Sequence, residues 1–147
     1  MTSHPPLFMH GLDEVVAWCP DGSRRVRDLL ADAWALARLL PDGAYLLNVC
    51  EDRYRFAVGF FAGLLAGKIS LQPASESAET FARLAMEFPG MVCLCEARFE
   101  SHGLVRLEFP ELPGADAEAI DRIPTIEAER VAAILFTSGS TGTPQAH

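Results

Sequence analysis

The chain has 147 residues, and 12 basic against 20 acidic side chains leave a formal net charge of −8. Half of the residues are hydrophobic and 22% are charged, which is typical of a folded domain and not of a disordered chain. Without a basic stripe, this acidic chain is not expected to bind nucleic-acid phosphates or an anionic membrane surface.

The first quarter of the chain predicts a hairpin and a helix. The opening residues lack a basic start followed by an apolar core, so no secretory signal is predicted and we expect a cytoplasmic protein. Val15–Cys19, a Pro-Asp-Gly turn and residues 23–26 predict a short β-hairpin. Apolar residues then recur from Val26 to Leu40 at spacings of three and four, which predicts a helix that ends before Pro41.

A strand at residues 45–50 and a buried helix at residues 53–67 are expected next, because the second segment is apolar almost all round. Gly59, Gly63 and Gly67 stand four apart and share one helix face, which favours close approach of that face to a sheet. The uncharged apolar stretch at 56–67 is well short of the roughly 20 residues of a membrane-spanning helix, so no span is predicted.

Strands and one further helix alternate in the middle of the chain. Residues 69–72 predict a strand, and Ser75 or Ser77 can cap the helix that follows. Residues 91–95 predict a buried strand, in which the thiols of Cys93 and Cys95 share one face and pack into the core. Zinc binding is not predicted, because a second cysteine pair at ligand spacing is missing. Residues 105–109 alternate apolar and charged side chains, as an edge strand does.

The last part of the chain is expected to form a surface loop at residues 110–130, a final strand at 131–136 and a phosphate loop at 137–144. Strands that alternate with helices predict an α/β fold with a parallel, helix-covered sheet, preceded here by a short N-terminal β-hairpin.

The sequence TSGSTGTP, which directly follows the last strand, carries the chemistry. Gly139 and Gly142 allow close approach of the backbone, and successive N–H groups in such a turn form an anion-binding nest. Neither a Walker A loop, which needs a lysine, nor the dinucleotide and hydrolase glycine patterns match. By composition alone, such a segment is more often an ordinary flexible loop.

The string ILFTSGSTGTP at residues 134–144 resembles the phosphate loop of the AMP-forming adenylating superfamily, which includes acyl- and aryl-CoA synthetases, peptide-synthetase adenylation domains and luciferases. Residues 46–67 and the Leu-Gln-Pro at 71–73 resemble the segments that precede this loop in the family. The resemblance implies an ATP-dependent ligase that converts a carboxylic acid to an adenylate and transfers the acyl group to a thiol of CoA or an acyl carrier protein. It implies that the phosphates of ATP are held by Thr137, Ser138, Gly139, Ser140, Thr141, Gly142 and Thr143.

Two features depart from this family. Gln145 stands where the family usually has a lysine. Family members are several-fold longer, and the resemblance places the ligand of Mg²⁺, the adenine and ribose contacts and the catalytic lysine beyond His147. Residues 1–147 are therefore expected to be a single partial domain that is inactive alone, with no catalytic residue or metal ligand assigned in it. The alternative is a non-catalytic half-domain that acts as a protein-interaction module.

Overall fold

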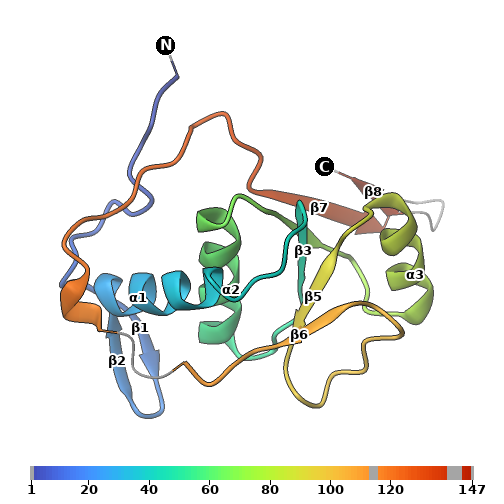
Figure 1. Ribbon diagram of the computed structural model, residues 1–147, viewed down its shortest axis with the longest axis horizontal. Coiled ribbons are helices and arrows are strands. Elements are labelled where there is room, and N and C mark those ends of the chain that lie inside the picture. The colour runs from blue at the N-terminus through green and yellow to red at the C-terminus, as the bar shows by residue number, and fades with distance from the viewer. Residues whose placement is uncertain (1, 113–115, 139–143, 147) are drawn as a thin grey trace.

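The structure, a computed structural model, describes residues 2–112, 116–138 and 144–146. A helix-covered sheet forms most of the molecule, and a small hairpin projects at one side (Figure 1). Within the described residues the elements are, in chain order, β1 (Val15–Cys19), β2 (Gly22–Arg25), α1 (Val26–Ala37), β3 (Tyr45–Asn48), α2 (Arg53–Leu65), β4 (Ile69–Gln72), α3 (Ala78–Glu87), β5 (Val92–Cys95), β6 (Arg106–Glu108), the 3₁₀ turn η1 (Ala117–Ala119), β7 (Ala133–Ser138) and β8 (Pro144–Ala146).

The main sheet has the strand order β6-β5-β3-β4-β7-β8 within the described part of the chain. The strands from β6 to β7 in this order run parallel, and β8 runs antiparallel to β7. β1 and β2 pair antiparallel in a separate hairpin. The predicted α/β fold, with a parallel sheet and an N-terminal hairpin, is therefore confirmed, and β6 lies at the edge of the sheet as its alternating side chains predict.

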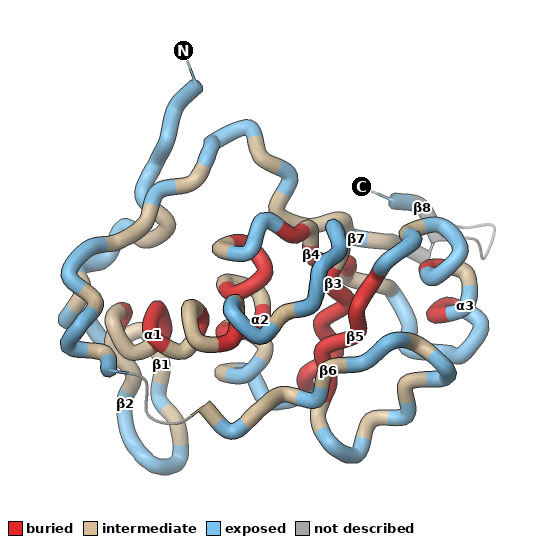
Figure 2. Tube along the Cα trace, viewed as in Figure 1, coloured by how far each residue is buried: buried red, intermediate tan, exposed pale blue. Residues whose placement is uncertain are grey.

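Helices cover both faces of the sheet. α1 and α2 lie over one face, where Leu46 and Val58 belong to one core cluster. α3 lies over the other face, where Leu47 and Phe81 belong to a second cluster. Adjacent residues of β3 thus supply opposite cores, as the two-residue period of a strand requires, and Figure 2 shows the buried residues gathered in the strands and the helix sides that face them. No helix among the described residues is long and apolar enough to cross a membrane.

Two glycines let α2 lie close against the sheet. A Cβ atom at Gly59 would lie 2.6 Å from Leu94 Cδ2 and 2.7 Å from Asn48 Nδ2, and one at Gly63 would lie 3.2 Å from Leu46 Cδ2. The predicted glycine face is confirmed at these two positions. The prediction is wrong for Gly67, which follows the end of α2 with a φ of +80° and belongs to the turn that leaves the helix.

Several element boundaries differ from the sequence prediction by one to three residues, most clearly those of α1 and β7. α1 ends at Ala37 and not near Leu40, because the next residues form i→i+3 turns, with Leu39 N donating to Leu36 O at 2.9 Å. The final strand spans 133–138 and not 131–136, because β8 pairs with the second half of β7 and extends it. The expected phosphate loop at 137–144 thus begins inside β7 and ends inside β8.

The expected surface loop at 110–130 is held by the start of the chain. Leu7 N donates to Pro124 O at 2.8 Å, and Ile126 N donates to Pro5 O at 3.1 Å. These bonds form a short antiparallel pairing beside α1 and α2, along the outside of the molecule (Figure 1). The N-terminal segment therefore fixes the path of the chain towards β7.

Candidate functional site

The two ends of the predicted phosphate loop are held together by β7 and β8. Thr137 pairs with Gln145, and Ser138 pairs with Pro144, in an antiparallel ladder. The ladder places both ends of the 139–143 segment side by side. Of the residues predicted to bind phosphate, Thr137 and Ser138 lie in β7, whereas the others lie outside the described residues: Gly139, Ser140, Thr141, Gly142 and Thr143.

Open α/β sheets bind ligands at the edge formed by the carboxyl ends of their parallel strands. The binding site lies where two neighbouring strands lead to helices on opposite faces of the sheet. β3 leads to α2 over one face, and its neighbour β4 leads to α3 over the other. β7 pairs with β4 in parallel and ends at the same edge. The phosphate-loop motif therefore starts one strand away from the topological switch point of the sheet.

A cavity of about 440 Å³ opens at the carboxyl ends of β3 and β5. Glu96, which follows β5, organises its wall. One carboxylate oxygen of Glu96 accepts from the backbone N–H of Glu51 at 2.8 Å, and the other lies 3.3 Å from Arg55 Nη1. Glu96 therefore joins the turns that follow two neighbouring strands, a role that depends on strand order and that no local pattern in the sequence indicates.

Asn48 and Asp52 fix the turn from β3 into α2. The buried Asn48 donates from Nδ2 to Phe56 O at 2.9 Å and accepts from Cys50 N at 3.3 Å. Asp52 caps α2, since its side chain accepts from Arg55 N at 2.8 Å. This helix end thus carries its own carboxylate, which disfavours an anion at the start of α2.

Gln72, the last residue of β4, has a buried side-chain nitrogen without a hydrogen-bond partner in the described part of the chain. In the β4–β7 ladder it lies beside Leu135, which is 55% exposed. A buried donor without an acceptor costs about 1–3 kcal/mol, so such a group needs a physical reason to persist. In the sequence, Gln72 is simply a glutamine that precedes Pro73. Its buried side-chain nitrogen becomes evident only from the packing in the structure.

The thiols of Cys50, Cys93 and Cys95 are buried. Burial raises the pKa of Cys50 and of Cys93 to about 12, and it also raises the pKa of Cys95. Nearly all of each thiol is therefore protonated at neutral pH, whereas the thiolate is the reactive form. The expected packing of Cys93 and Cys95 in the core is confirmed.

Native alkylation is expected to be confined to Cys19, which is half-buried, whereas the other three cysteines are buried. Iodoacetamide at about pH 8 should add one group to the folded chain and four after denaturation in guanidinium chloride, as counted by intact-mass spectrometry. Two or more adducts that form on the folded chain as fast as the first would contradict the burial of these thiols.

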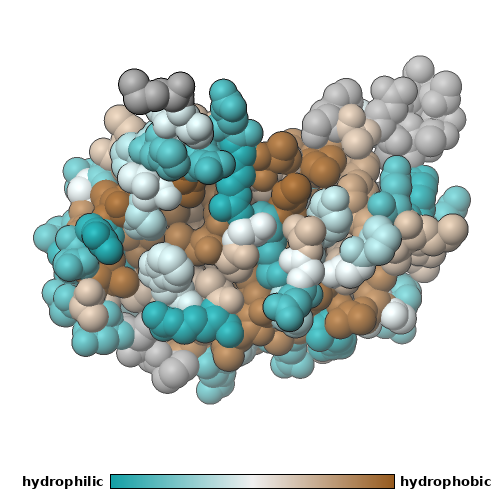
Figure 3. Space-filling view, turned by 45° about the horizontal axis from the view of Figure 1, so that its top comes forward, coloured by the Kyte–Doolittle hydropathy of each residue, from teal (hydrophilic) through white to brown (hydrophobic). Residues whose placement is uncertain are grey.

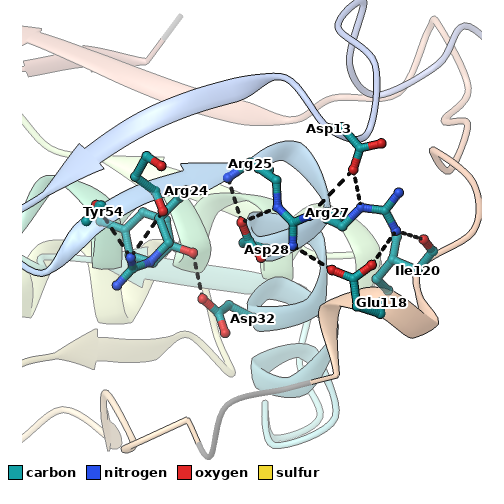
Figure 4. A network of polar contacts seen from close by, with 11 residues as sticks. Asp13, Arg24, Arg25, Arg27, Asp28, Asp32, Tyr54, Glu118 and Ile120 are labelled. Atoms are coloured by element: carbon teal, nitrogen blue, oxygen red, sulfur yellow. Dashed lines mark hydrogen bonds and ion pairs between the residues drawn. The ribbon is translucent and has the colours of Figure 1, made fainter.

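A larger cavity of about 590 Å³ lies beside the hairpin, but most of the charged side chains that line it are already paired. Arg24 contacts both carboxylate oxygens of Asp21 at 2.7 and 2.9 Å, and its guanidinium lies 5.4 Å from the centre of the Tyr54 ring. Tyr54 donates its hydroxyl proton to Asp32 at 2.6 Å. Figure 4 also shows a second group of ion pairs, which links the start of α1 to η1 and involves Asp13, Arg25, Arg27, Asp28 and Glu118. Both groups tie elements of the fold together.

Asp32 makes a pH-dependent contribution to stability, because burial raises the pKa of its carboxyl group. A folded-state pKa above the unfolded value gives stability that is present below the unfolded pKa and is lost as the pH rises through the folded pKa. We therefore expect Asp32→Asn, which keeps an acceptor for Tyr54, to gain stability relative to the wild type as the pH rises from about 4 to 7. Urea midpoints at the two pH values measure this difference. A variant that loses relative stability as the pH rises would contradict the burial of a carboxylate here.

Metal ligands are not grouped in the described part of the chain, where no set of three or more His, Cys, Asp and Glu side chains is arranged to hold an ion.

Neither a family model nor a curated protein matches this sequence. Solved structures match it by fold. The o-succinylbenzoate coenzyme A synthetase MenE from Bacillus subtilis, in complex with AMP, has a TM-score of 0.69 and 20% identity over 90% of this chain and 37% of that chain. ATP-bound MatB from Rhodopseudomonas palustris has a TM-score of 0.67 and 20% identity over 95% of this chain and 32% of that chain. PA1221, a peptide-synthetase protein with adenylation and PCP domains, has a TM-score of 0.65 and 26% identity over 90% of this chain and 28% of that chain.

The chain has the adenylating-enzyme fold. The predicted resemblance to the AMP-forming superfamily is thereby confirmed at the level of the fold. The chain spans about a third of the length of the matched structures. In the adenylating fold it corresponds to the N-terminal domain region, with the hairpin and the parallel sheet.

Proposed function

We propose that this chain is the N-terminal part of an ATP-dependent ligase that activates a carboxylic acid. The observation that carries the proposal is the motif TSGSTGTP, which begins within β7 beside the topological switch point of an adenylating fold. Either feature alone is compatible with other functions. Together they favour a loop that binds the phosphates of a nucleotide at the carboxyl edge of the sheet.

The proposed reaction has two steps. A carboxylate oxygen of the acid attacks the α-phosphorus of ATP, the bond from that phosphorus to the β-phosphate oxygen breaks, and pyrophosphate leaves. The sulfur of CoA or of an acyl carrier protein then attacks the acyl carbon, and AMP leaves. Mg²⁺, whose ligand the family resemblance places beyond His147, would neutralise charge on the phosphates when it is bound.

The loop residues stabilise the departing pyrophosphate in this proposal. Their N–H and hydroxyl donors face negative charge that grows as the bond to the α-phosphorus breaks, and donors held in place beforehand need little reorganisation. The β7–β8 ladder supports this role, because it fixes both ends of the 139–143 segment. Gln145, opposite Thr137 in the ladder, adds no charge to the site.

The exposed side chains around β7 support the proposal that the chain is part of a longer protein. In that protein, residues 1–147 form a single partial domain that is inactive alone. Val131 is 52% exposed and Leu135 is 55% exposed, and the latter lies beside Gln72, whose side-chain nitrogen has no hydrogen-bond partner among the described residues. Figure 3 shows hydrophobic side chains gathered near the end of the molecule that carries β7. Further protein packed over this face would bury these side chains and supply an acceptor for the amide. A cytoplasmic location remains part of the proposal.

Phosphate binding by the chain is tested by titration with ATP, pyrophosphate and AMP, followed through backbone amide resonances. We expect ATP and pyrophosphate at millimolar concentration to shift the amides of residues 137–143, and AMP, which lacks the β- and γ-phosphates, to leave them in place. Amides at the opposite side of the molecule, such as those of β1, serve as the internal control. Shifts by all three ligands alike, or by none, would contradict the phosphate-loop assignment.

A further inference from the structure

An apolar groove of about 420 Å³ lies on the hairpin side of the molecule, away from β7 and β8 (Figure 1). Side chains from β1, α1 and α2 line it, together with a residue of the N-terminal segment: Phe8, Val16, Trp18, Leu29, Ala57 and Phe61. Trp18 stands at its rim and is 83% exposed. An exposed indole beside an apolar groove is typical of a protein–protein contact, since a tryptophan contributes about 150–250 Å² of surface when it is buried.

Two charged side chains of opposite sign lie at or beside this hairpin groove. Arg53 is one of the residues that line it. Glu14 directly precedes β1, whose residues 16–19 line it. Both side chains are exposed, and in the described part of the chain neither forms an ion pair. Glu14 accepts one hydrogen bond, from the backbone N–H of Gly11 at 3.2 Å.

We propose that the hairpin groove binds a second copy of this chain about a twofold axis, with Trp18 of each copy seated in the groove of the other. A twofold contact needs a surface that is complementary to itself, and this one carries both the projecting side chain and the groove. Antiparallel overlap of the two grooves brings Glu14 of one copy towards the partner's Arg53, and the same pair forms again on the other side of the axis. These pairs offer local attraction that two chains with a net charge of −8 otherwise lack.

Sedimentation equilibrium of the whole chain over a hundredfold range of concentration tests the association. We expect a reversible dimer. Trp18→Ala should raise its dissociation constant by about 30-fold or more, because buried tryptophans are common hot spots of interfaces. Met86→Ala is the matched control, because Met86 is 85% exposed but lies on α3, away from the groove, and this variant should dimerise as the wild type does.

Charge reversal tests the orientation of the two copies. Glu14→Arg alone and Arg53→Glu alone should each weaken the dimer by about tenfold, and the two changes together should restore it to within about threefold. All of these side chains are exposed, so far-UV circular dichroism should show an unchanged fold. A chain that is monomeric at every concentration, a dimer indifferent to Trp18→Ala, or a double reversal without recovery would each overturn the proposal, and none of these results bears on nucleotide binding at β7.

Discussion

Replacing Gly59 with alanine is expected to lower the free energy of unfolding by about 2 kcal/mol, within the range for overpacked cores. The added Cβ would lie 2.6 Å from Leu94 Cδ2 and 2.7 Å from Asn48 Nδ2, closer than real carbon contacts allow. Leu94 is fully buried, and Asn48 is held by its bonds to Phe56 O and Cys50 N. The substitution must therefore move α2 or break those bonds. Urea unfolding measures the loss.

Gly63→Ala is the matched control on the same helix face. Its nearest contact would be 3.2 Å, to the terminal methyl of Leu46, which can move by a few tenths of an ångström. Alanine is favoured over glycine by about 1 kcal/mol inside a helix, so this variant should be close to neutral. Equal midpoints for Gly59→Ala and the wild type would show that α2 does not lie against β3 and β5 as described.

The elements that the sequence predicted well are those that local signals determine. A Pro-Asp-Gly turn after a short apolar segment predicted the hairpin of β1 and β2, and the expected strand at residues 69–72 is β4. Ser75 and Ser77 were equivalent candidates to cap the next helix. The structure selects Ser77, whose side chain accepts from Thr80 N at 3.1 Å, while Ser75 contacts the Thr80 hydroxyl at 2.8 Å.

Features that depend on contacts between distant segments were not predictable in this way. The order of strands in the sheet places Glu96 beside the turn after β3, and nothing near Glu96 in the sequence indicates that neighbour. The end of β7 was misplaced because pairing with β8 extends it beyond its apolar residues. Gln72 was not predicted as a site residue. Its side-chain nitrogen lacks an acceptor among the described residues, and only the packing shows this.

The candidate site was found by a different route. Two glycines among five hydroxyl residues predict a turn that can bind an anion, but the same composition suits a flexible loop. The similarity of the whole string to a family motif favoured the first interpretation. The structure adds the position of the motif at the carboxyl edge of the sheet, and the assignment of the individual phosphate-binding residues remains a prediction.

Removing two hydroxyl donors from the loop is expected to have the largest effect on activity. In a longer ligase that contains this sequence, Ser140→Ala combined with Thr141→Ala removes two groups proposed to hold the departing pyrophosphate. Each donor is worth about 1–3 kcal/mol in a site shielded from water. Because about 1.4 kcal/mol corresponds to a factor of ten, single-turnover adenylation should slow by about 30-fold to ten-thousandfold.

Gln145→Ala is the control for this double substitution, because Gln145 is neutral and the proposed site does not use a charge there. It should slow adenylation by less than about tenfold. The competing explanation is that the two hydroxyls only shape the turn, in which case the double variant would lose thermal stability and keep its rate. Melting temperatures measured on the same variants separate the two explanations. A full adenylation rate at normal stability in the Ser140/Thr141 variant would show that these hydroxyls do not hold the pyrophosphate.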